Sequence, residues 1–328
     1  MNPAYSVILF TVLSGVGYGL LAVLGLLCLF SLNAASVLIN ISVLLISLIL
    51  ITAGLISSTS HLGRPERAWR ALSQWRTSWL SREGVLAVLT YVPALLLALI
   101  WGIEFVPENS VLWAELWAEL WKDEIQTYIS VIGGVAGLFA ISTVFCTGQI
   151  YASLRTIPAW HYSLTTPIYC VLSITSGLLL WIFLSALFGY DVNQIIMVIT
   201  IGMLEASLIL KWVYWRYVDS AEFGVTKADA IGFETQTQVQ NLEPANQTQN
   251  YLMREMGYHI ARKHALKLRR YAALAGFIMP ALLLLLIFVN PSYALVFSFA
   301  AIISYLFGLL IERWLFFAEA KHIVTLYY

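Results

Sequence analysis

Residues 59–84 read TSHLGRPERAWRALSQWRTSWLSREG and separate two apolar runs, 36–58 and 84–105. The stretch holds five of the eighteen Lys and Arg residues of the 328-residue chain, whereas the two runs hold one ionisable residue, Glu104. Each run has the roughly 20 apolar residues that a helix needs to cross a bilayer core. The stretch therefore predicts a basic connection at one membrane surface between two spanning helices.

The composition of the whole chain is that of a membrane protein with several spans. Hydrophobic residues make up 60% of it and charged residues 11%, which is more apolar than a soluble domain of this size. The apolar runs are about twice as long as the strands of a membrane barrel, so we expect helices. The first run is too long for the core of a signal peptide, and we expect it to remain as the first span.

The predicted fold is an all-α polytopic membrane protein, an eight-transmembrane-helix bundle that forms a single membrane domain over 1–328. Residues 107–124, PENSVLWAELWAELWKDE, predict an interfacial helix between spans three and four, because their tryptophans share one helical face. Residues 217–270 predict a polar cytoplasmic loop with a basic helical end. The expected spans are about 5–31, 36–58, 84–105, 126–150, 165–187, 193–216, 271–289 and 292–314.

Lys and Arg residues are distributed very unevenly between the two sides of these spans. Seventeen of the eighteen fall on the side of the 59–84 loop, and only Lys122 falls on the other. Because cytoplasmic connections carry the excess of Lys and Arg, this loop and both termini are expected in the cytoplasm, as for a multi-pass protein of a bacterial cytoplasmic (inner) membrane.

Two groups of residues inside the spans also indicate packing or function. Span one carries Gly15, Gly17 and Gly19, which favour close approach of another helix but could also line a ligand groove. Span six carries Glu205 near its middle, which predicts a buried carboxyl with a structural or proton-path role.

His61 and Glu83 place two proton-exchanging side chains at the same membrane interface. A quinone that takes up two electrons also takes up two protons, and an imidazole and a carboxylate can relay them. We expect Arg64 to tune both groups, and Ser81 to cap a helix whose first turn contains Glu83. An ordinary basic interfacial loop has the same composition, so the residues alone leave both interpretations open.

The loop motifs HLGRPERA (61–68) and SWLSRE (78–83) closely resemble those of the membrane-anchor subunits of dimethyl sulfoxide reductase-type molybdenum enzymes, and IYASLRTIPAW (150–160) is similar to the same family. The resemblance implies an eight-helix anchor that holds an iron–sulfur electron-transfer subunit and a molybdopterin catalytic subunit. Such a chain is not catalytic alone. It exchanges electrons with the quinone pool, either ubiquinone or menaquinone.

The resemblance also implies roles for particular residues. The quinone-site histidine of the family falls on His61 and its loop carboxylate on Glu83, with Arg64 in the shared pattern. Further residues near the site are expected to be Ser60, Arg67, Trp79, Arg82, Tyr151 and Trp160. The cytoplasmic charge bias favours the sulfite-oxidising branch, in which quinone is reduced, over a quinol-oxidising anchor. We expect membrane lipid as a further partner and no nucleic acid.

Two other classes of protein remain open. A cytochrome b-type anchor needs histidines on facing helices, whereas the five histidines of this chain lie at or beyond the ends of spans; a haem between His61 and His161 would be the exception. A secondary transporter would use Glu205 and the glycines of span one. The three cysteines form no ligand cluster, so no haem or metal is expected in this chain.

Overall fold

The computed structural model describes residues 4–31, 36–60, 62–103, 124–233, 239, 240, 242 and 260–326. Within these ranges every span is helical, and eight helices are long and apolar enough to cross a membrane. The prediction of an all-α polytopic membrane protein is confirmed. His61 and the expected interfacial helix, apart from residue 124, lie outside the described residues, as does much of the polar loop.

The spanning helices follow each other along the chain with short connections. They are α1 (Tyr5–Leu29), α2 (Val37–Thr59), α3 (Trp79–Ile103), α5 (Ile125–Ala152), α6 (Thr165–Leu187), α7 (Gln194–Ser220), the continuous α10 (Ile260–Ala273), π-helical η2 (Leu274–Ile278) and α11 (Met279–Val289), and α12 (Ala294–Ala318). The short elements are the 3₁₀-helices η1 (Pro65–Gln74), η3 (Pro291–Tyr293) and η4 (Ile323–Leu326), and α8 (Lys227–Ala230).

Several helices extend beyond the apolar runs that predicted them, and α3 and α7 are two examples. Helix α3 begins at Trp79, five residues before the apolar run, and α7 continues to Ser220. Both extensions carry charged side chains that find partners inside the protein, Arg82 on α3 and Asp219 on α7. A hydropathy pattern predicts that a span ends before its first charged residues, whereas each of these two helices includes them.

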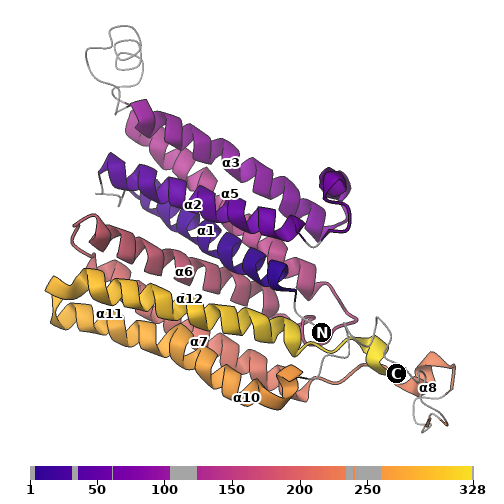
Figure 1. Cartoon of the computed structure of the whole chain (residues 1–328). Helices are drawn as coiled ribbons and strands as arrows, with labels where there is room; N and C mark the ends of the chain where they lie inside the picture. The colour runs from indigo at the N-terminus through magenta and orange to yellow at the C-terminus, as the bar shows by residue number, and fades with distance from the viewer. Residues whose placement is uncertain are drawn as a thin grey trace.

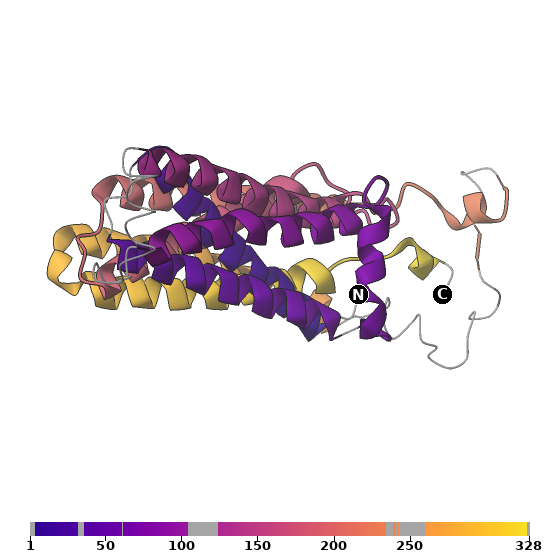
Figure 2. The same ribbon diagram turned by 90° about the horizontal axis from the view of Figure 1, so that it is seen from above.

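The helices form two groups that meet along α1 and α6 (Figure 1). Helices α1, α2, α3 and α5 make one group, and α6, α7, α10–α11 and α12 make the other. Both termini lie at the same end of the bundle, and η1 lies across the helix ends there (Figures 1 and 2). We call this the terminal end of the bundle.

Close contact between the two groups depends on small residues where α1 crosses α6. A Cβ atom on Gly19 would lie 1.8 Å from the carbonyl oxygen of Ser173, and one on Gly177 would lie 2.2 Å from the carbonyl carbon of Gly19. The Ser173 hydroxyl also donates to the Gly15 carbonyl at 2.6 Å. Gly19 therefore packs against α6 and Gly17 against α2, whereas a Cβ on Gly15 would meet no atom within 4 Å. In lipid such close backbone contact replaces the hydrophobic effect as a source of association.

Replacing Gly19 by alanine is expected to separate α1 from α6, because the new methyl group would overlap backbone atoms that cannot move alone. Overpacking of this kind costs about 1–3 kcal/mol. The thermal unfolding temperature of the purified protein in detergent should fall. Gly202→Ala is the matched control, since a Cβ there meets no atom within 4 Å; equal unfolding temperatures for the two variants would contradict the role of the crossing.

Candidate functional site

A cavity of about 440 Å³ opens at the terminal end of the bundle, between η1 and the ends of four helices. Its volume lies in the range of small-molecule sites. Most of its wall is apolar, and the polar side chains are few. The lining residues are Val7, Phe10, Leu55, Ser58, Thr59, Leu62, Arg64, Arg67, Ala68, Ala71, Leu72, Leu80, Glu83, Gly84, Ile150 and Tyr151. We call it the Glu83 cavity.

Glu83 is the buried ionisable group of this cavity, with 5% of its surface exposed. It lies in the second turn of α3 and not in the first turn, as the sequence had suggested, because the helix starts at Trp79. The Thr147 hydroxyl, on α5, donates to Glu83 Oε1 and also lies 3.1 Å from the Thr143 carbonyl oxygen.

The position of Thr147 suits both protonation states of Glu83. Its hydroxyl donates to Glu83 when the carboxyl is ionised. When Glu83 is protonated, the acid proton can be donated to Thr147 Oγ1 while the hydroxyl turns to the Thr143 carbonyl. A buried carboxyl that keeps a hydrogen bond in both states can gain and lose a proton without leaving an unsatisfied polar group.

Side chains from the start of α3 hold η1 over the mouth of the cavity. The Ser81 hydroxyl donates to the Ala71 carbonyl, so Ser81 ties η1 to α3; Ser78, not Ser81, accepts a hydrogen bond at the start of the helix, from the Ser81 backbone N–H at 3.4 Å. Arg82 donates to the carbonyls of Trp75 and Arg76, at 3.0 and 2.7 Å. Arg64 and Arg67 thereby lie at the cavity rim and remain exposed.

The other residues expected near this site divide into two sets. Arg67 and Tyr151 line the cavity together with Arg64 and Glu83. The remaining ones support it: Trp79 contacts Phe145 and lies under the Arg82 guanidinium at 4.3 Å, Trp160 packs edge-on against Tyr151 and donates to the Phe316 carbonyl at 2.9 Å, and Ser60 is exposed and donates to the Ser57 carbonyl.

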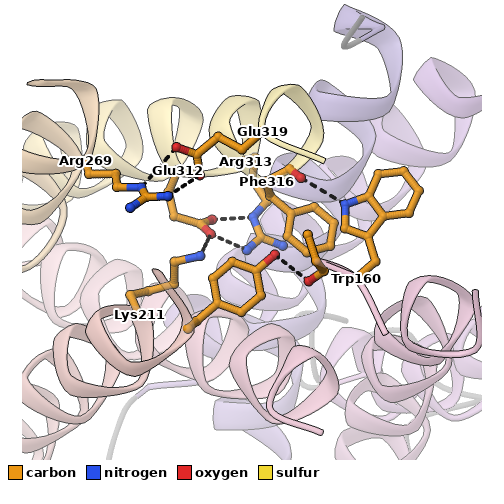
Figure 3. Close-up of polar contacts among 9 residues, drawn as sticks. Trp160, Lys211, Arg269, Glu312, Arg313, Phe316 and Glu319 are labelled. Carbon is orange, nitrogen blue, oxygen red and sulfur yellow. Dashed lines mark hydrogen bonds and ion pairs between the residues drawn. The ribbon is translucent and has the colours of Figure 1, made fainter. Parts of the chain in front are cut away.

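Glu312, on α12, is fully buried in the second helix group, whereas Glu205 is not. Glu205 is exposed on the outer surface of α7, which corrects the expectation that it is buried. Lys211, six residues further along α7, points inward, and its Nζ lies 2.6 Å from Glu312 Oε1 (Figure 3). Arg313 donates to both oxygens of the same carboxylate. Lys211 and Arg313 were counted as surface cations from the sequence, but both are buried.

A second ion cluster lies beside the first, at the terminal end of α12 (Figure 3). Arg269 donates to both oxygens of Glu319, at 3.0 and 3.1 Å, and to Asp219 at 2.8 Å. Burial raises the pKa of Glu319, and the nearby Arg269 guanidinium opposes this shift. Together the two clusters hold three cations and three carboxylates: Lys211, Arg269, Arg313, Asp219, Glu312 and Glu319.

A metal site would need a cluster of His, Cys, Asp or Glu side chains. Among the described residues no three His, Cys, Asp or Glu side chains are arranged to hold a metal ion. The ring of His161 is exposed, and its Nδ1 lies 2.6 Å from the Ala152 carbonyl oxygen.

The fold and the cavity define an integral membrane protein of eight spans with a ligand-sized site at one membrane surface. Residues 1–318 match the family described as DMSO reductase anchor subunit (DmsC), and the chain belongs to this family. It is thus the membrane anchor subunit of a molybdoenzyme complex, with catalytic and electron-transfer partners. This confirms the family that the loop motifs indicated.

One relative is similar over its full length. The chain is 34% identical to a subunit of the sulfite dehydrogenase of Allochromatium vinosum over 336 aligned residues, which cover 100% of this chain and 99% of the relative.

Glu312→Gln is expected to destabilise the bundle more than Lys211→Met. The first change leaves two buried cations without their carboxylate, and breaking a buried ion pair in this way costs about 3–5 kcal/mol. The second leaves Glu312 bonded to Arg313. Unfolding temperatures of the two purified variants test this order, and an equal loss in both would contradict it.

Proposed function

We propose that this anchor exchanges electrons between the quinone pool and an iron–sulfur subunit, and that quinone is reduced at the Glu83 cavity while a molybdopterin subunit oxidises sulfite. The observation that carries the site is the buried Glu83 carboxyl at an apolar cavity of about 440 Å³ at the membrane surface. The similarity to the Allochromatium vinosum sulfite dehydrogenase subunit supports sulfite as the substrate of the partner.

The residues present fit a quinone. Its isoprenoid tail needs apolar surface that opens towards lipid, and Phe10, Leu55 and Leu80 supply this around the cavity. Its head group carries two oxygens that accept hydrogen bonds. Tyr151, Arg64 and Arg67 offer donors on the cavity wall, and His61, outside the described residues, follows α2 directly in the chain.

Glu83 is proposed to supply protons to the bound quinone. Quinone brings two-electron, two-proton chemistry to the site. Glu83 holds one proton at a time, and Thr147 stabilises the carboxyl before and after the transfer. Arg64 and Arg67 at the rim add positive charge close to the site, which favours the ionised carboxyl after it has lost its proton.

The partner subunits are proposed to dock on the terminal end of the bundle, which we place in the cytoplasm. Lys211, Arg269 and Arg313 are buried, and the remaining fourteen of the seventeen cations still indicate this orientation. On η1 and the residues directly after it, exposed arginines alternate with exposed Trp69 and Trp75. Arg and Trp are enriched at the centres of protein interfaces. An iron–sulfur cluster docked there would lie close to the Glu83 cavity.

Glu83→Gln in the assembled complex should lower quinone reduction about 100-fold or more, because the amide cannot exchange a proton and general acid–base groups contribute about that much. Activity of the catalytic subunit with ferricyanide as acceptor should not change. Glu205→Gln is the matched control: it makes the same substitution on the outer surface of α7 and should keep full quinone activity.

The comparison of Glu83→Gln with Glu205→Gln tests whether quinone is reduced at the Glu83 cavity. Wild-type quinone turnover in Glu83→Gln would show that Glu83 is not the proton donor, and equal losses in Glu83→Gln and Glu205→Gln would point to assembly rather than to the cavity. His61→Ala is expected to behave like Glu83→Gln.

Turnover in sealed proteoliposomes should generate no membrane potential. The cavity and the proposed docking surface lie at the same end of the bundle, so electrons and protons are exchanged with one side of the membrane. A voltage-sensitive dye is the measurement, with valinomycin and a potassium gradient as the positive control. A potential that builds up with turnover and collapses with an uncoupler would contradict the one-sided arrangement.

A further inference from the structure

A small polar cavity of about 20 Å³ lies behind Glu83, on the far side of Thr147. It is enclosed by α1, α5, α6 and α12. Its polar lining includes Thr11, Ser14, Tyr18, Thr147, Tyr169 and Arg313. Thr147 thus contacts Glu83 on one side and this cavity on the other.

The hydroxyl groups of Tyr18 and Tyr169 indicate what the small cavity holds. Both are buried, and neither makes a hydrogen bond of good geometry within the described part of the chain: the Tyr18 hydroxyl lies near the Thr143 hydroxyl and the Tyr169 hydroxyl near the Arg313 guanidinium. A buried hydroxyl without a partner costs about 1–3 kcal/mol, and buried polar groups of this kind are commonly satisfied by internal water. About one probe sphere of space suffices for a water molecule in a polar site, and this cavity provides it.

The small cavity connects to the first ion cluster through Arg313. The Arg313 guanidinium lines the cavity, lies 4.3 Å from the centre of the Tyr169 ring and donates to Glu312. Glu312 in turn contacts Lys211 at 2.6 Å. An arginine keeps its proton in proteins, so Arg313 orients water and carboxylate here and does not itself carry a proton.

The second ion cluster lies between Glu312 and the protein surface (Figure 3). Glu319, the C-cap residue of α12, lies seven residues after Glu312, which is two helical turns. The Trp215 ring lies close to a cation of each cluster, with Lys211 Nζ 5.3 Å and the Arg269 guanidinium carbon 5.9 Å from the ring centre. A surface cavity of about 230 Å³ is lined by Arg269, Glu319 and Asp219, and the Asp219 side chain is 59% exposed.

We propose that this series of polar groups is a buried proton route, which leads from the surface cavity at Asp219 and Glu319, past Glu312 and the water site at Tyr169, to Glu83. The inference rests on the proposed quinone chemistry. Glu83 is nearly buried, and a ligand in its cavity would lie between it and the mouth. A proton that replaces one given to the ligand therefore reaches Glu83 through Thr147, from the side away from the cavity mouth.

The proton balance follows from the reaction. Quinone gains two electrons, which the iron–sulfur partner loses, and two protons, which form the two hydroxyl groups of the quinol. Each proton leaves the Glu83 carboxyl for a quinone oxygen. Water in the small cavity then reprotonates Glu83 through the Thr147 hydroxyl, and the surface cavity returns one proton to that water by way of the two ion clusters and water molecules between them.

Tyr18→Phe and Tyr169→Phe test the route in the assembled complex. Each removes a hydroxyl that makes no hydrogen bond of good geometry within the described chain, so neither change breaks a well-formed hydrogen bond of the fold. Quinone reduction with sulfite as donor, measured with decylubiquinone and with a menaquinone analogue, should fall about tenfold or more. The solvent isotope effect in D₂O should rise, while KM for quinone and ferricyanide activity stay unchanged. Tyr305→Phe is the control, since its buried hydroxyl donates to the Leu172 carbonyl at 2.8 Å and lies outside the small cavity.

The outcomes separate the two proposals. Wild-type turnover in both tyrosine variants, with Glu83→Gln inactive, overturns the route and leaves the quinone site standing. Wild-type turnover in Glu83→Gln overturns the quinone site itself. An equal loss in Tyr305→Phe, or a loss without a change in the isotope effect, shows a packing effect and also overturns the route.

Discussion

Where α1 crosses α6, the Ser173 carbonyl occupies the space that a side chain on Gly19 would fill. This contact brings the two helix groups together in the central part of α1 and places the Ser173 hydroxyl on the Gly15 carbonyl. The small polar cavity lies beside it, with walls from both groups. If α1 and α6 were held apart by larger residues, Tyr18 and Tyr169 would no longer face the same space, and Thr147 would border lipid or bulk water.

The buried ion clusters illustrate how charge is kept in an apolar bundle. A lone charge in a low-dielectric interior is very costly, and the cost falls when partners and hydrogen bonds surround it. Glu312 has two cationic partners, and Arg269 has two anionic ones. Such clusters add little to stability compared with well-packed apolar side chains. A role in function therefore explains the presence of these clusters better than a contribution to stability does.

Most of the fold followed from hydropathy, because the length and apolar character of each run are enough to set a span in a bilayer. The position of Glu83 at the membrane surface followed from the same pattern. The cavity around it did not, since it depends on η1 folding back over α3 through Ser81 and Arg82, contacts that no periodicity encodes. The expected span 292–314 ends just after Glu312 and Arg313, so hydropathy alone places this pair at the membrane surface. The apolar residues 314–318 after it were the available signal that the pair lies inside a helix.

Glu205 was predicted to be buried, but it is exposed. Its depth in the span was correct, but depth does not determine which face of the helix a residue occupies. Lys211, on the same helix, is the residue that points inward. The sequence of α7 does not show which face of the helix is buried, because apolar residues lie around much of its circumference.

The charged side chains inside the described helices gather in the half of the bundle nearest the termini. In the other half the helices hold only apolar and uncharged polar side chains, and Glu205, near the middle, faces outward. A voltage across the membrane falls mainly over the layer that water and mobile charge do not enter. The dry half therefore carries most of the electric field, and charges that move between the terminal surface and Glu83 cross little of it. Because moving one charge through the full field is worth about 2.3 kcal/mol per 100 mV, this placement would make the proposed chemistry at Glu83 insensitive to the membrane potential.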